Sequence, residues 1–328
     1  MFPDMTHPIL MGVMVGASAH RAGLCTVKAV AELMTTGRAH VLWSFLKASL
    51  WTLGFLSVAS LFGAAPELAA RPLSAMSLAG GMVFGIGAAL NGACSISTMS
   101  RLAEGHASML MTLAGWGIGL LVMQGAGLGP REPSVGSGLS PWLLVPGLAF
   151  MVWEGTRLVL RLRRNWRGLF VDGYWPLSLG VLVLAAANAG LLLVDRPWSF
   201  TSTAICSAEA VPLEACANPV SLWPVSGAAL TAMIVSARLR GHFRLRPVRI
   251  RSALRRLMAG SLMGMGAAVI PGGNDGLILF GIPALSPHAL PAWIGIVAGI
   301  WLALALMRGL GARVPTIRCE NDVCRAGM

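Results

Sequence analysis

Residues 80–95 read GGMVFGIGAALNGACS, and residues 260–275 read GSLMGMGAAVIPGGND. The segment GIGAA at 85–89 aligns with GMGAA at 264–268, and polar residues follow both within otherwise apolar sequence. Irregular backbone within a membrane is tolerated only against protein or a cavity, so both stretches predict interrupted transmembrane helices. The duplication predicts inverted repeats, which are typical of secondary transporters. The alternative explanation is that small residues simply help helices pack.

The composition of the whole chain indicates a membrane protein. Only 12% of the 328 residues are charged and 55% are hydrophobic, whereas a soluble domain has about 25% charged residues. A soluble enzyme, a coiled coil, a disordered chain and a secreted disulfide scaffold are therefore excluded. The net charge of +12 includes arginine clusters at 161–167 and 238–256. Because both clusters lie between apolar segments, they indicate cytoplasmic loops rather than a nucleic-acid surface.

Nine apolar segments follow one another along the chain, and most reach the ~20 residues that a helix needs to cross the bilayer. They lie at 8–25, 41–65, 73–99, 107–129, 139–160, 176–194, 219–237, 257–282 and 288–308. The predicted fold is an all-α polytopic membrane protein with about nine transmembrane helices, two inverted repeats and short broken helices.

We expect one transmembrane domain over residues 1–328. Its parts are repeat 1 at about 8–129, a linking helix at about 139–160, repeat 2 at about 176–308 and a short cytoplasmic tail at 309–328.

The loops predict the orientation of the chain in the membrane. The arginine-rich links 161–175 and 238–256 belong inside by the positive-inside rule. The link 195–218 contains three acidic residues against Arg196 and belongs outside. Alternation of nine segments then places the N-terminus outside and the C-terminus in the cytoplasm.

Two cysteines lie at predicted helix interruptions. Cys94 lies between Gly92 and Ser95 at the first motif's break, where Asn91 and Ser95 add hydrogen-bonding groups to the candidate path. Cys25 ends a third interruption, HRAGLC at 20–25. Arg21 would share a helical face with Cys25 and would lower the pKa of that thiol. Both thiols are candidates for a substrate path, although a buried cysteine is ordinarily a small apolar residue.

Four further polar residues lie within apolar segments. Asn274 and Asp275 interrupt the second motif, where an intramembrane carboxylate is by default a functional candidate. Asp275 could take up a proton, bind a cation or cap a helix that begins near Gly276. Glu154 and Arg157 are spaced as an ion pair on one helix, and we expect this pair to be structural.

The remaining cysteines fall outside the predicted path. Cys206 and Cys216 lie in the predicted outer link, where a disulfide is possible in an oxidising compartment. Cys319 and Cys324 lie in the tail, match no strong metal-binding pattern and are expected to be reduced. No metal ion, no cofactor and no catalytic motif is indicated, so the sequence does not predict an enzyme.

The chain resembles the YeeE/YedE family of bacterial inner-membrane transporters for thiosulfate and related sulfur species. The similar segments are GASAHRAGLC ending at Cys25, GGMVFGIGAALNGACS ending at Ser95, RPWSFTSTA at 196–204, and GMGAAVIPGGNDGLIL around Asp275. These segments are spread through both halves of the chain.

The resemblance implies a mechanism in which short helices converge on a central axis and cysteine thiols pass thiosulfate along it. Cys25 and Cys94 match family cysteines, but this sequence has Asn274 and Asp275 in the region where family transporters typically have another cysteine. A charged Asp275 would repel a dianion, which leaves room for another sulfur- or selenium-containing solute. The family often works with a small cytoplasmic sulfur carrier resembling TusA, which would be a separate partner here.

The sequence therefore predicts an inner-membrane permease for a small sulfur-containing anion. One alternative is a membrane thiol oxidoreductase that uses Cys25 and Cys94, although the chain contains no CxxC motif. Another is a non-transporting membrane subunit that binds a partner through its basic loops.

Overall fold

The computed structural model describes residues 5–64, 68–128, 135–137, 141–165, 173–209, 216, 221–320 and 322–326. The helices are α1 (Thr6–Ala22), α2 (Thr26–Thr36), α3 (His40–Leu61), α4 (Ala75–Asn91), α5 (Ser95–Ala103), α6 (Met109–Gly125), α7 (Pro141–Asn165), α8 (Leu177–Val194), α9 (Phe200–Ser207), α10 (Leu222–Leu239), α11 (Ile250–Val269), α12 (Gly273–Gly276), the π-helix η4 (Leu277–Gly281) and α13 (Ala289–Gly309). Two antiparallel strand pairs complete the described chain, β1 (Leu68–Ala70) with β2 (Val135–Ser137) and β3 (Ile317–Glu320) with β4 (Val323–Ala326).

Within these described ranges, seven helical segments are long and apolar enough to cross a membrane. The chain is thus a mostly helical, multi-pass membrane protein, with fewer full-length apolar spans than the nine expected. Of the other two expected segments, α6 is apolar but has only 17 residues. Helix α7 has 25 residues, but its last two turns carry several arginines.

The three predicted helix interruptions are confirmed. Helix α1 ends at Gly23 and α4 ends at Gly92, both with positive φ angles (62° and 73°) that glycine adopts without strain. Helix α11 ends at Ile270, and Gly272, at φ 125°, precedes the single turn α12. Each interruption ends an apolar helix inside the bundle and begins a short helix there.

A fourth short helix, α9, was not predicted. Its residues were assigned to the outer link 195–218, but most of α9 is buried, including Thr201 and Ile205. Ser199 caps its first turn by accepting from the Ser202 N–H, and the Ser202 hydroxyl accepts from the Ser199 N–H in return. Part of this link, and part of the link 161–175, lie outside the described residues.

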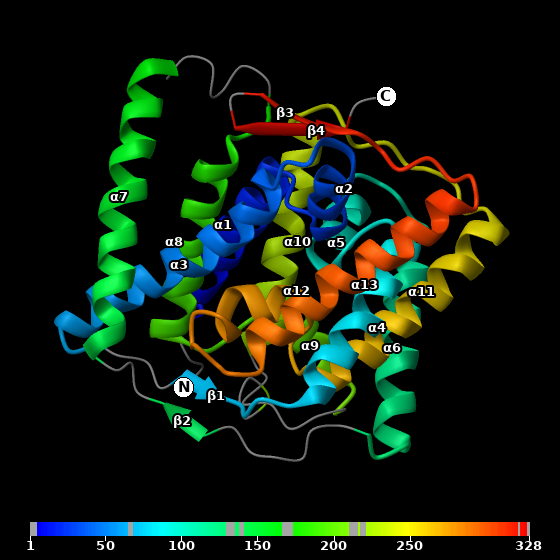
Figure 1. Ribbon diagram of the computed structural model, residues 1–328, viewed down its shortest axis with the longest axis horizontal. Helices are drawn as coiled ribbons and strands as arrows, with labels where there is room; N and C mark the ends of the chain where they lie inside the picture. The colour runs from blue at the N-terminus through cyan, green and yellow to red at the C-terminus, as the bar shows by residue number, and fades with distance from the viewer. Residues whose placement is uncertain are drawn as a thin grey trace.

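The long helices pack in two groups. Helix α4 packs against α11 and α13, and α11 packs in turn against α6. On the other side, α1 packs against α8 and α10, and α8 packs against α3. Figure 1 shows α7 at one side of the bundle beside α3 and α8, with α6 and α11 at the opposite side.

Glycines allow the closest of these contacts. A Cβ atom added at Gly115 of α6 would overlap the Leu257 carbonyl oxygen of α11, and one added at Gly260 of α11 would overlap the Thr112 carbonyl oxygen of α6. The two backbones are therefore nearly in contact, as in small-xxx-small packing of membrane helices.

Gly115→Ala is expected to destabilise the protein by about 1–3 kcal/mol, because the added methyl group forces α6 away from α11. Gly117→Ala on the same helix is the matched control, since a Cβ there meets nothing within 4 Å. The measurement is the thermal unfolding midpoint of both variants in detergent. Equal midpoints would contradict the close contact.

The end of α7, the link between α10 and α11 and the hairpin β3–β4 lie toward the same face of the bundle (Figure 1). Tyr174, from the link before α8, has the guanidinium carbon of Arg240 3.6 Å and that of Arg325 5.0 Å from its ring centroid. The Ser178 N–H donates to the Asp322 carboxylate at 2.8 Å. Segments that the positive-inside rule assigns to one side of the membrane thus contact one another.

Candidate functional site

The two free cysteines among the described residues lie together at the centre of the bundle. Cys25 immediately precedes α2 and Cys94 immediately precedes α5, and both side chains are buried. The Ser97 hydroxyl lies 3.0 Å from the Cys25 sulfur and 3.5 Å from the Cys94 sulfur. The Thr26 N–H donates to the Cys94 sulfur at 3.5 Å. A serine hydroxyl therefore bridges two thiols that are far apart in the sequence.

Both thiols lie at helix N-termini, which determines their electrostatic environment. The first N–H groups of α2 and α5 have no intrahelical acceptor, and the helix dipole adds positive potential there. Arg101, in the last turn of α5, adds a positive charge that interacts with Cys25. This environment favours an anion or a partial negative charge beside the sulfurs.

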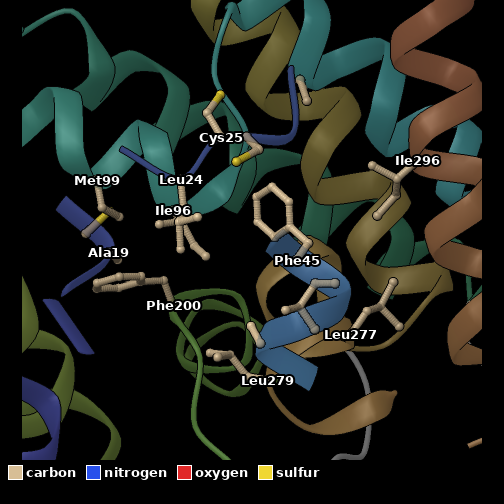
Figure 2. Close-up of a cluster of buried hydrophobic side chains, with 14 of the residues drawn as sticks. Ala19, Leu24, Cys25, Phe45, Ile96, Met99, Phe200, Leu277, Leu279 and Ile296 are labelled. Carbon is tan, nitrogen blue, oxygen red and sulfur yellow. The ribbon is translucent and has the colours of Figure 1, made fainter. Parts of the chain in front are cut away.

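The surroundings of the thiol pair are otherwise apolar. Figure 2 shows Cys25 at the edge of a buried cluster to which several helices contribute. Its labelled members include Ala19 of α1, Phe45 of α3, Ile96 of α5, Phe200 of α9, Leu277 of η4 and Ile296 of α13. An anion beside the thiols would exchange its water shell for S–H and N–H donors in a region of low dielectric constant.

The Asp275 carboxylate lies against the N-terminus of the short helix α9. The Thr201 N–H, in the first turn of α9, donates to one carboxylate oxygen at 3.1 Å, and the Thr201 hydroxyl donates to the other. The Ser95 hydroxyl is also close to this carboxylate. Asp275 lies inside α12 rather than before it, so its carboxylate caps α9 and not the helix that begins near Gly276. Of the three roles considered for Asp275, the cap of the helix that begins near Gly276 is thus not formed.

Asn274, the neighbour of Asp275, has no exposed surface. Neither its amide nitrogen nor its amide oxygen finds a hydrogen-bond partner among the described residues. Burying an amide without partners costs a few kcal/mol. Asn274 therefore offers one donor and one acceptor at the centre of the bundle.

Asn91 has a supporting role at the interruption before Cys94. Its amide nitrogen donates to the Ala93 carbonyl oxygen at 3.0 Å and to the Thr98 hydroxyl at 2.9 Å, and its amide oxygen accepts from the Thr112 hydroxyl at 2.8 Å. These bonds join α4, α5 and α6. Asn91 contacts neither thiol directly and fixes the backbone that carries Cys94.

Arg21 does not lie beside the thiols, so its predicted position was wrong. Because α1 ends at Ala22, Arg21 and Cys25 do not share a helix. The Arg21 guanidinium instead donates to the Ser236 hydroxyl at 2.9 Å and to the Gly173 carbonyl oxygen at 3.3 Å.

His20 belongs to the same polar group as Arg21. Its Nδ1 lies 2.9 Å from the Ser236 hydroxyl, and its Nε2 lies 3.5 Å from the Glu104 carboxylate. Burial alone would raise the pKa of Glu104, but the hydrogen bond and positive charge of His20 hold that pKa below its ordinary value. This group links α1 to the segment after α5.

A small cavity lies beside Asp275. Its volume is about 10 Å³, which is close to the space that one water molecule needs. Its lining is mostly apolar and includes Asp275 and Ile96 but neither thiol. Among the described residues, the cavity thus adjoins Asp275 and neither thiol lines it.

Ser97 and Thr201 are site residues that the sequence reasoning missed. Both lie in the first turn of a short helix. Ser97 lies two residues after the segment that ends at Ser95, and Thr201 lies within RPWSFTSTA at 196–204. The signal that could have identified them is their position within one turn after an interruption of an apolar segment. The partner of each lies on a different element, which no local pattern reveals.

The other four cysteines form two disulfides. Cys206 and Cys216 are bonded to each other after α9, in the link where a disulfide was considered possible. Cys319 and Cys324 are bonded across the hairpin β3–β4. The expectation of two reduced thiols in the tail was therefore wrong, because the hairpin register places these residues directly opposite each other.

The comparisons with known proteins agree with this arrangement. The family model described as "Sulphur transport" matches residues 21–302, which include both thiols, Thr201 and Asp275. The thiosulfate transporter TsuA of Spirochaeta thermophila is 27% identical over 269 residues, which cover 70% of this chain and 77% of that protein. Both point to a transporter rather than an enzyme. Because the family model covers most of the chain, the protein belongs to the sulphur-transport family, the YeeE/YedE family.

Proposed function

We propose that the protein imports thiosulfate across the bacterial inner membrane along a path that contains Cys25 and Cys94. The observation that carries this proposal is the pair of free thiols bridged by Ser97 at the N-termini of α2 and α5. The family assignment supports transport of a sulfur compound, and the named relative supports thiosulfate.

The site offers thiosulfate weak donors and no strong ligand. Each thiol can donate an S–H bond to the terminal sulfur or an oxygen of the anion, and the helix N-termini add N–H groups and positive potential. Ion conduction requires contacts that replace hydration yet are weak enough to release the ion. Thiols satisfy this requirement better than arginine, whose bidentate contacts bind an anion tightly.

Asp275 belongs to the same proposed path, together with Ser95 and Asn274. The N-terminus of α9 and the Thr201 hydroxyl partly offset its negative charge. The Asn274 amide, on the residue before Asp275, has no hydrogen-bond partner among the described residues and could donate to an anion there.

We also propose that the two halves form an inverted repeat about a central linking helix. Contacts between α4 and α11 support it, because a Cβ added at Gly87 would crowd the Ala259 carbonyl oxygen and one added at Gly266 would crowd the Gly80 carbonyl oxygen. These contacts are equivalent under the alignment of the two glycine-rich motifs. One transmembrane domain with its N-terminus outside follows from this arrangement and from the positive-inside rule.

The arginine-rich face then lies in the cytoplasm. It would meet a separate sulfur carrier, similar to TusA, as the family resemblance implies. The partner surface is proposed from charge and orientation alone.

The test is uptake of radiolabelled thiosulfate by cells that lack their own importers. Cells that express the protein should accumulate thiosulfate, and Ser97→Ala should reduce the rate several-fold because the thiols lose their bridge. Ser100→Ala is the matched control, since Ser100 lies one turn later on α5 and bonds to the Ile96 carbonyl oxygen and to Met233. Absence of uptake by the membrane-inserted wild-type protein would exclude thiosulfate as the substrate. Equal rates for both variants would exclude a role for the bridge.

The closeness of two free thiols also fits a second function, a membrane thiol oxidoreductase. Cys25 and Cys94 would then form a disulfide by giving two electrons and two protons to an acceptor. Thiol trapping during uptake distinguishes the two functions. A permease keeps both thiols reduced throughout, whereas an oxidoreductase shows a disulfide that forms and disappears with turnover.

A further inference from the structure

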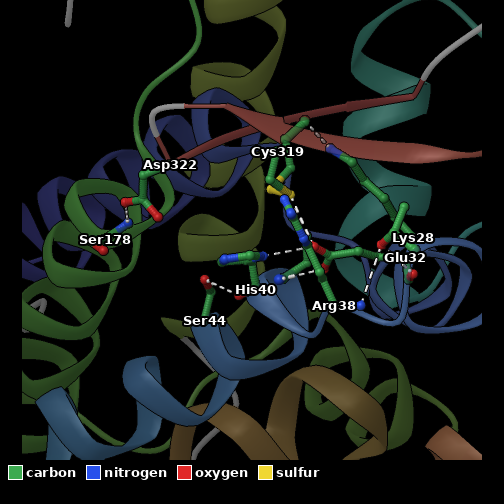
Figure 3. The surroundings of a disulfide bond; sticks show 11 residues. Lys28, Glu32, Arg38, His40, Ser44, Ser178, Cys319 and Asp322 are labelled. Atoms are coloured by element: carbon green, nitrogen blue, oxygen red, sulfur yellow. Dashed lines mark hydrogen bonds and ion pairs between the residues drawn. A yellow bond between two sulfur atoms is a disulfide. The ribbon is translucent and has the colours of Figure 1, made fainter.

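A second group of potential ligands, separate from the thiol pair, lies between α2, the start of α3 and the hairpin β3–β4. A carboxylate oxygen of Glu32 and the sulfurs of Cys319 and Cys324 lie within 4.8 Å of one another. The Nδ1 atom of His40 is 3.2 Å from the Glu32 carboxylate. Figure 3 shows Glu32, His40 and Cys319 facing one another around the disulfide.

The Glu32 carboxylate is the central feature of this group. It is almost fully buried, at 1% exposure. One of its oxygens accepts from the Val41 N–H at 2.9 Å, and the other lies 3.2 Å from the Cys319 sulfur. A disulfide sulfur carries no proton, so this last contact brings together two atoms that can only accept. The contact becomes favourable when the sulfur is a thiol or when a cation lies between the two atoms.

The hairpin places both sulfurs on the side of this carboxylate. Cys319 and Cys324 pair directly across the two strands, so their side chains leave the same face of the hairpin. That face packs against α2, which carries Glu32. Two sulfurs and one carboxylate oxygen thus lie close to one another, and the His40 imidazole nitrogen lies against the same carboxylate.

This donor set has the chemistry of a zinc site. Zinc takes four ligands from cysteine sulfur, histidine nitrogen and carboxylate oxygen in structural sites, at about 2.0–2.3 Å. Magnesium and calcium prefer oxygen ligands and do not match two sulfurs. Three of the four donors come from buried or partly buried residues, so a bound ion would be largely shielded from water.

Two positive side chains border the group. The Lys28 ammonium donates to the Cys324 carbonyl oxygen. Arg38 is exposed and extends its side chain toward Cys319 (Figure 3). Two thiolates and one carboxylate carry three negative charges, which a divalent ion and one of these two cations balance.

We propose that the reduced Cys319–Cys324 pair binds a zinc ion with Glu32 and His40, and that the disulfide is the metal-free, oxidised form of the same site. A cellular dithiol would reduce the disulfide: the S–S bond breaks, each cysteine gains one electron and one proton, and the dithiol becomes a disulfide. Zinc binding then displaces the two thiol protons into solvent.

The test uses the full-length protein, purified in detergent and reduced with a phosphine, with free thiols counted before metal is added. After dialysis against zinc, wild-type protein should retain about one zinc ion per chain. Cobalt added in place of zinc should give the absorption of a tetrahedral, thiolate-bound ion. Cys319→Ser/Cys324→Ser should lose both signals.

Glu32→Gln and His40→Gln should each weaken zinc binding at least about tenfold, because each removes one ligand. The double variants Cys25→Ser/Cys94→Ser and Cys206→Ser/Cys216→Ser are controls that should retain the zinc ion. Retention of zinc by Cys319→Ser/Cys324→Ser would overturn the proposal. A fully reduced wild-type protein that takes up no zinc would also overturn it, as would a pair that stays oxidised under the phosphine.

Discussion

Replacing Cys94 by alanine is expected to reduce thiosulfate uptake roughly 10- to 100-fold, because a hydrogen bond to a charged group is worth about 1.5–3 kcal/mol. Cys94 has no exposed surface, so the substitution removes the donor without changing the surface of the protein. Cys25→Ala should have a similar effect, since the two sulfurs share Ser97. Initial rates of labelled thiosulfate uptake, normalised to the protein in the membrane, are the measurement.

The matched control is Cys94→Ser, which keeps a donor at the same position. Its rate should exceed that of Cys94→Ala, while both variants unfold at similar temperatures. A well-expressed Cys94→Ala variant with the wild-type rate would show that the thiol is not on the path. The thiol pair would then be a packing feature of the helix ends.

Lys47→Met is expected to destabilise the protein by about 3–5 kcal/mol, the usual cost of breaking a buried ion pair. Lys47 of α3 and Glu154 of α7 form an ion pair in the bundle, and both are nearly inaccessible to solvent. The Lys47 ammonium also donates to the Ser178 hydroxyl of α8 at 3.1 Å. Without Lys47, the Glu154 carboxylate stays buried and uncompensated. The thermal unfolding midpoint in detergent reports the loss.

The double variant Lys47→Met/Glu154→Gln should recover much of this stability, because it removes both charges together. Arg157→Met is the control on the same helix. Arg157 is exposed and lies over the Trp153 ring at 4.2 Å, so its replacement should change stability little. A single and a double variant of equal stability would contradict the ion pair.

The Lys47–Glu154 pair also shows where sequence reasoning reached its limit. The spacing of Glu154 and Arg157 predicted a pair within one helix, and that prediction was wrong. The actual partner lies on a helix that the linear sequence separates by more than a hundred residues. Local spacing identifies which residues can pair, whereas helix packing decides which do.

The helix interruptions were predictable because their cause is local. Gly23 and Gly92 end helices by adopting positive φ angles, and polar residues follow them within apolar sequence. Helix α9 escaped prediction because Asp195, Glu209 and Arg196 make its surroundings look like a polar loop. Its burial depends on contact with α12, which no pattern near residue 200 encodes.

The candidate site was predictable in part for the same reason. Cys25, Cys94 and Asp275 could be selected because each lies at a local break in an apolar segment. Ser97 and Thr201 could not, since their roles come from the sulfur or carboxylate that another element places beside them. Arg21 was predicted beside Cys25 because both were placed on one helix, whereas α1 ends before Gly23.

The hairpin β3–β4 also constrains the order in which the protein can fold. Lys28 and Cys324 are separated by 296 residues, and Glu32 and Cys319 by 287. During synthesis, these two contacts of α2 cannot form until nearly the whole chain has been made. Contacts of such long range form late. We therefore expect α2, which begins directly after Cys25, to lack its contacts with the hairpin until the second half of the chain is in place.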